Sequence, residues 1–98
     1  MAIHNLITPE KLEKYFSITQ QALDKAKLAF DEKRQSQAED FFDMASRYFQ
    51  DAKFFYKEKQ DYVNAFAALN YAHGLLDAGA RIGLFKVNDS QLFTVDDN

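Results

Sequence analysis

Three ionisable side chains and an amide lie at helical spacing in the C-terminal half of the chain. His73, Asp77 and Arg81 are four residues apart, and Asn70 precedes the histidine by three. On a helix this spacing places all four on one strip of the surface. A carboxylate one turn from an imidazole can orient the ring as a general base or a metal ligand, and the guanidinium can bind an anion.

The same strip also has a structural interpretation. Asp77 can neutralise His73 and Arg81 in a buried or interfacial network, which makes helix pairing specific at some cost in stability. Catalysis would need further groups from other helices, and the sequence does not place them. We therefore favour the structural interpretation and assign no catalytic residue.

Other kinds of reactive site lack support in the sequence. The chain has two histidines, His4 and His73, and neither belongs to a Glu-x-x-His or His-Glu-x-x-His pattern, so we expect no metal. No glycine-rich segment matches a phosphate loop, and no serine has the setting of a catalytic nucleophile. There is no cysteine, which excludes disulfides and thiolate sites. We expect no cofactor.

The segment that carries the polar strip is predicted to be a helix over residues 61–83, with Asp61 as its N-cap and Gly83 at its end. Residues 61–85 contain three charged side chains, whereas residues 9–34 contain eleven and residues 35–60 contain nine. Apolar residues fall on two stripes of this helix, whereas a helix that buries only one side needs a single stripe. A membrane span is not expected, because polar residues interrupt the segment.

Two amphipathic helices are expected to precede it. Thr8 and Pro9 predict the start of a helix that ends near residue 34, and Ser36 with Glu39 matches a capping box that starts the next. The first apolar stripe consists of Leu12, Phe16, Thr19, Leu23, Ala26 and Phe30. The second, before a polar turn at residues 57–60, alternates rings with alanines: Ala38, Phe42, Ala45, Phe49, Ala52 and Tyr56. Phe54 lies off this stripe and is expected to be exposed.

These elements predict an all-α fold, an up-and-down three-helix bundle with a short, mostly irregular C-terminal tail. The expected regions are an extension over residues 1–8, the bundle over 9–85 and an acidic tail over 86–98. Leu92 and Phe93 form the main apolar pair of that tail, and we expect them to dock on the bundle.

Length and composition limit the classes of function. A chain of 98 residues with 47% hydrophobic residues is expected to fold as one domain around a modest core. Twelve basic and fifteen acidic residues give a net charge of −3, and lysines of the first helix alternate with acids, so nucleic acid is not an expected partner. The N-terminal residues do not resemble a secretory signal, and we expect a cytoplasmic protein with no membrane association.

The segment over residues 61–85 resembles the signature block of the archaeal "domain of unknown function 357" family. The resemblance rests on Tyr71-Ala72-His73-Gly74 and Asp77-Ala78-Gly79, with Ala38-Glu39-Asp40 and Asp51-Ala52-Lys53 upstream, and it extends over residues 9–95. It implies three helices in an up-and-down bundle, an archaeal cytosolic origin and no assigned activity. With the residues that the block singles out, the candidate polar strip is Asn70, Tyr71, His73, Gly74, Asp77 and Arg81.

The last two helices are also similar to half of a prokaryotic HEPN nucleotide-binding or ribonuclease domain. That family places an arginine shortly before a histidine, whereas Arg81 follows His73, which argues against ribonuclease activity. The expected function is a non-catalytic module that forms a homodimer or binds a protein partner through residues 61–84. The expected interface residues are Phe54, Ala67, Gly74 and Ala78. The alternative is a nucleotide- or anion-binding domain that uses His73, Asp77 and Arg81.

Overall fold

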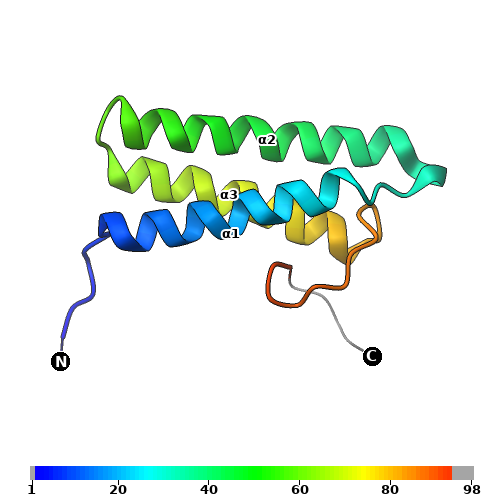
Figure 1. Cartoon of the computed structure of the whole chain (residues 1–98). Helices are drawn as coiled ribbons and strands as arrows, with labels where there is room; N and C mark the ends of the chain where they lie inside the picture. The colour runs from blue at the N-terminus through cyan, green and yellow to red at the C-terminus, as the bar shows by residue number, and fades with distance from the viewer. Residues whose placement is uncertain (1, 94–98) are drawn as a thin grey trace.

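The computed structural model describes residues 2–93, and its three helices run up, down and up (Figure 1). They are α1 (Pro9–Lys27), α2 (Gln35–Lys57) and α3 (Tyr62–Arg81), and a 3-10 turn, η1 (Glu32–Arg34), precedes α2. α3 packs against both other helices, whereas α1 and α2 contact each other little. The predicted all-α bundle is confirmed. No helix within the described residues is long and apolar enough to cross a membrane.

The predicted apolar stripes form the core. Each helix contributes small residues beside large ones, so the helices can approach closely while the rings fill the space between them. Phe16 of α1, for example, packs edge-on against Phe49 of α2, with 5.7 Å between ring centroids. The buried helical positions are Leu12, Thr19, Ala22, Leu23 and Ala26 on α1, Ala38, Ala45, Phe49 and Ala52 on α2, and Ala65, Leu69, Ala72, Leu76, Gly79 and Ala80 on α3.

Two of the predicted helix starts are confirmed by their caps. The hydroxyl of Thr8 accepts a hydrogen bond from the backbone N–H of Lys11 at 3.1 Å, and Pro9 is the first residue of α1. The carboxylate of Asp61 accepts from the backbone N–H of Asn64 at 3.1 Å and from its side-chain amide at 2.6 Å. These bonds stabilise the charged carboxylate and lower the pKa of Asp61.

The predicted capping box at Ser36 and Glu39 is wrong. α2 begins at Gln35, no side chain caps its first turn, and Ser36 is already inside the helix. The reason is that η1 leads directly into α2 and is itself capped by Asp31, whose carboxylate accepts from the backbone N–H of Lys33 at 3.1 Å. A residue in helical conformation cannot serve as an N-cap, which requires extended backbone.

The predicted end of the first helix near residue 34 is also wrong, because α1 ends at Lys27. The chain beyond it pairs with the segment that follows α3. The backbone N–H of Asp31 donates to the carbonyl of Leu84 at 2.8 Å, and that of Lys86 donates to Ala29 at 2.7 Å. These bonds surround an isolated antiparallel bridge between residues 30 and 85. Long-range pairing therefore replaces the last helical turns that local propensity favours.

The segment after α3 folds back onto the bundle. α3 ends at Arg81, before the predicted end at Gly83, which adopts a left-handed conformation with φ of 80° and turns the chain. Leu92 and Phe93 are buried, as predicted. Asp89 holds this turn beside α1, since its carboxylate pairs with Lys25, and this hydrogen bond is the main cause of a lowered pKa at Asp89. The acidic residues expected at positions 96 and 97 lie outside the described residues.

Candidate functional site

The polar strip of α3 is centred on a contact between His73 and α1. Nδ1 of His73 lies 3.0 Å from Oγ1 of Thr19, a side chain that is 1% exposed, and Nε2 lies 3.7 Å from Oδ1 of Asp77. A carboxylate beside Nε2 favours a proton on that nitrogen, which leaves Nδ1 to accept a hydrogen bond from the threonine hydroxyl. The imidazole thus satisfies a buried hydroxyl and joins α1 to α3.

This arrangement limits the chemistry of the strip. Thr19 occupies one ring nitrogen of His73, and the other nitrogen faces Asp77. Among residues 2–93, no group of three or more histidine, aspartate or glutamate side chains could hold a metal ion. Asn70 and Arg81 are exposed on the helix surface, and none of the three surface hollows described below includes a strip residue. The geometry supports the structural interpretation of His73 and Asp77.

The exposed face of α3 shares residues with the polar strip and is poor in charge, with Arg81 near the end of the helix as the charged side chain exposed on it. We call this surface the α3 flank, and its residues recur every three or four positions: Val63, Ala67, Asn70, Tyr71, Gly74, Ala78 and Ile82, all exposed. The exposed fractions of Val63, Tyr71 and Ile82 are 69%, 52% and 52%. The exposed positions of α1 and α2, in contrast, are mostly charged or amide side chains. The buried pair at residues 92 and 93 leaves the flank uncovered.

Gly74, in the middle of the flank, has no explanation within the chain. A Cβ atom built on this residue would have no atom within 4 Å apart from its chain neighbours and the nearby backbone of its own helix. Glycine in an exposed helix interior is less stable than alanine by ~1 kcal/mol. The other two glycines are required by the fold, since Gly79 makes room for Phe85 and Gly83 has a positive φ. A missing side chain on an open surface allows another backbone to approach closely.

The remaining predicted interface residues are exposed as expected. Ala67 and Ala78 lie on the α3 flank with Gly74, whereas Phe54 is exposed on α2 with the ammonium group of Lys59 5.7 Å from its ring centroid. Tyr71 packs against the ring of Tyr48 on α2 with 4.3 Å between centroids. This contact fixes the tyrosine at the border between the two helices.

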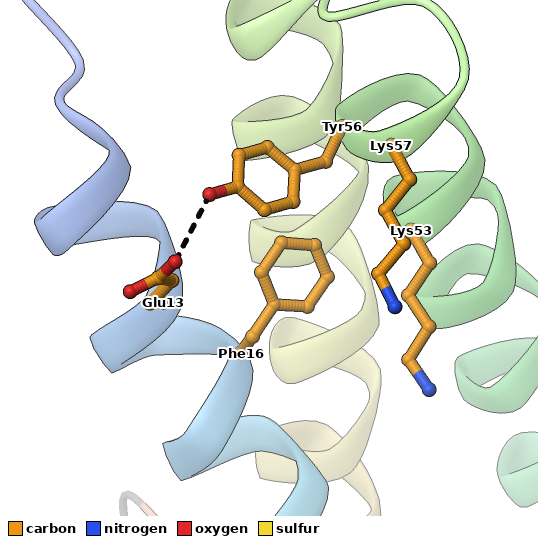
Figure 2. Close-up of a pocket in the computed structure, with 5 residues that line it drawn as sticks. All are labelled: Glu13, Phe16, Lys53, Tyr56 and Lys57. Atoms are coloured by element: carbon orange, nitrogen blue, oxygen red, sulfur yellow. Dashed lines mark hydrogen bonds between the residues drawn. The ribbon is translucent and has the colours of Figure 1, made fainter.

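α1 and α2 are separated by a groove that the sequence pattern does not predict. One hollow, of about 250 Å³, is lined by Glu13, Phe16, Lys53, Tyr56 and Lys57 (Figure 2). A second, of about 260 Å³, lies further along the same two helices. A third, beside the α1–α2 connection, is lined by residues 30–33 and 86. The available signal is the pair of lysines one turn apart beside Tyr56, but the apolar stripes predict that Phe16 and Tyr56 lie in the core.

Comparison with known protein families identifies a match over most of the chain. The matching family is described as a protein of unknown function (DUF357), and it covers residues 14–85. The matched region begins within α1, contains all of α2 and α3, and ends at the residue that packs on Gly79. No curated protein and no solved structure matches the chain.

Proposed function

We infer that this chain, which belongs to the DUF357 family of proteins of unknown function, is a non-catalytic helical module that self-associates through the α3 flank. The observation that carries the proposal is the exposed, charge-poor flank with Gly74 at its centre. The solvent-exposed face of a helix usually carries charged side chains, as do the exposed faces of α1 and α2. An exposed apolar surface that also carries an unexplained glycine is typical of a helix that meets another helix.

A second copy of the chain is the occupant that fits this surface. If two α3 helices cross antiparallel at Gly74, each glycine lies opposite the other, and Tyr71 of one copy lies near Ala78 of the other. The interface then contains two equivalent contacts between a tyrosine ring and an alanine, and a two-fold axis relates them, as an isologous interface requires. In this antiparallel arrangement the two Arg81 side chains lie at opposite ends of the interface, so the flanks can meet without like-charge repulsion although each chain has a net charge of −3.

The size of the flank sets the expected strength of self-association. From residue 63 to residue 82 a helix extends for ~28 Å, and a strip about 10 Å wide over that length offers roughly 300 Å². Specific complexes bury ~800 Å² per partner, so residues beside the flank, such as Tyr48, must contribute. We therefore expect a weak dimer whose population depends on protein concentration.

The nucleotide- or anion-binding alternative has less support. It requires His73, Asp77 and Arg81 to line a pocket, whereas His73 is engaged with Thr19 and the hollows lie elsewhere. The two proposals differ in a measurable consequence. The anion-binding alternative predicts that a nucleotide or phosphate stabilises the chain, whereas a surface for self-association does not.

Sedimentation velocity over a wide range of protein concentrations tests the proposal. We expect the average mass of the wild-type chain to rise with concentration and that of Ala78→Glu to remain at the monomer value. Gln37→Glu is the matched control, because it adds the same charge at an exposed position of α2. A wild-type chain that stays monomeric throughout would refute self-association, as would equal behaviour of the two variants.

A further inference from the structure

The groove between α1 and α2 lies where these two helices contact each other little, with α3 passing behind it (Figure 2). Its first hollow contains the ring of Phe16, which packs against Tyr56 with 5.6 Å between centroids. Phe16 also contacts Phe49, a lining residue of the second hollow, so the two hollows adjoin. The second hollow is lined by Gln20, Leu23, Asp24, Lys27, Phe42, Ser46, Phe49 and Gln50.

The length of the groove favours a helix whose side chains enter the two hollows over a compact small molecule. The two adjoining hollows measure about 250 and 260 Å³ and together fall within the range of roughly 300–1,000 Å³ that is typical of small-molecule sites, so their length and not their volume distinguishes the occupants. Along α1 they extend from Glu13 to Lys27, which corresponds to ~21 Å of helix. The first depression is lined by the rings of Phe16 and Tyr56, and the second contains Leu23, Phe42 and Phe49 among polar residues. Two such depressions along ~21 Å match the repeat of large side chains on one face of a four-turn helix.

One wall of the first hollow is positively charged. Lys53 and Lys57 are one turn apart on α2, and Figure 2 shows their side chains extending in the same direction beside Phe16. Within residues 2–93 neither lysine forms an ion pair, and Lys53 lies over the ring of Phe49 with 4.8 Å to its centroid. These are unpaired positive charges on a chain whose net charge is −3.

A hydrogen bond joins α2 to α1 beside the first hollow (Figure 2). The Tyr56 hydroxyl donates to the carboxylate of Glu13 at 3.3 Å. Burial, followed by the charge of Glu13, raises the pKa of Tyr56, so the phenol remains a neutral donor at physiological pH. Glu13, the acidic residue that lines the first hollow, is therefore engaged by tyrosine, while Lys53 and Lys57 can meet a partner's carboxylates.

We propose that the α1–α2 groove binds an amphipathic helix of a partner protein, with apolar side chains in the two hollows and acidic side chains against Lys53 and Lys57. Such a helix would complete a four-helix bundle, and its apolar stripe would cover half-buried rings such as Phe16 and Phe42. Charge complementarity at the lysine end would set its position along the groove. This binding does not depend on self-association, because the α3 flank is a separate surface.

Selection from a phage-displayed library of four-turn helices tests the proposal. Each helix carries a leucine stripe, and the positions beside the stripe are randomised. We expect binding sequences to be enriched in Asp and Glu. Fluorescence anisotropy of the best peptide with the full chain should show about tenfold weaker binding by Lys57→Glu. Lys14→Glu is the matched control, since it makes the same change of charge at an exposed position of α1 outside the groove, and it should bind within about twofold of wild type.

The outcomes separate this proposal from the previous one. Amide chemical shifts that change at residues of both groove walls, together with unaltered peptide binding by Ala78→Glu, would support the groove whether or not the chain dimerises. The groove proposal fails if no peptide is enriched, if the enriched peptides lack acidic residues, if Lys57→Glu binds as tightly as wild type, or if the shifts map to the α3 flank.

Discussion

Two glycines of α3, five residues apart, should respond oppositely to the same substitution. Gly74→Ala adds a methyl group to an open surface, where the new carbon has no atom within 4 Å apart from its chain neighbours and the nearby backbone of its own helix. Gly79→Ala places that carbon 2.3 Å from Cε2 and 2.6 Å from Cδ2 of Phe85. The Phe85 ring is fully buried and also packs on Phe30, with 5.7 Å between centroids, so it cannot turn into solvent.

The magnitudes follow from these surroundings. Alanine is more stable than glycine in a helix by ~1 kcal/mol, and Gly74→Ala should gain this amount, which raises Tm by roughly 4–8 °C in a domain of this size. At Gly79 the same gain is opposed by overpacking, which costs about 3 kcal/mol at the upper end of its usual range. The expected net loss at Gly79 is therefore ~2 kcal/mol.

Urea unfolding followed by circular dichroism, at a protein concentration low enough to keep the chain monomeric, measures both values. Sedimentation of Gly74→Ala adds a second readout, since the added methyl group should weaken self-association while it stabilises the monomer. Loss of stability in Gly74→Ala would show that the flank is covered. A Gly79→Ala variant as stable as wild type would show that Phe85 does not pack on α3 as described.

Three further predictions concern the polar groups. His73→Ala leaves the buried hydroxyl of Thr19 without its partner and should lower the free energy of unfolding by ~1–3 kcal/mol. Urea titration should show a smaller loss when the same substitution is made in a Thr19→Val background. Equal losses in both backgrounds would contradict the contact. The pKa of Asp31 is lowered chiefly by its hydrogen bond from Arg34, so the contribution of this carboxylate to stability is present above its unfolded pKa near 3.8 and is lost as the pH falls through its folded pKa. Urea unfolding across acidic pH should therefore show that the free energy of unfolding declines less steeply with falling pH in Asp31→Asn than in wild type. Parallel curves for the two proteins would argue against this role. Nucleotides and inorganic phosphate should leave the Tm of the wild-type chain unchanged in a thermal-shift assay, and a stabilisation that disappears in Arg81→Ala would instead favour the anion-binding alternative.

The starts of two helices and the apolar stripes were predictable because they depend on neighbours in the sequence. An N-cap such as Thr8 or Asp61 acts on backbone N–H groups within its own first turn. The spacing of apolar residues likewise reports which side of a helix is buried, whatever covers it. The exposure of Ala67, Gly74 and Ala78 was accessible for the same reason.

The ends of the helices were decided by partners far along the chain. Residues 28–34 have helical propensity, but the backbone bonds of Asp31 and Ala29 go to the segment after α3, and Asp31 then caps the turn that makes Ser36 an interior residue. No local pattern contains the information that residues 31 and 84 meet, since a hydrogen bond between them depends on the packing of all three helices.

The candidate functional surfaces were likewise predictable where they depend on local sequence and unpredictable where they depend on packing. The sequence alone determined that α3 is short of charge, that its polar residues share one strip and that a glycine stands among its exposed positions. Only the tertiary structure decided that His73 meets Thr19 and that α1 and α2 separate to leave a groove beside Lys53 and Lys57. Periodicity shows that a face must be buried, whereas the identity of the neighbour that buries it depends on how all the helices pack together.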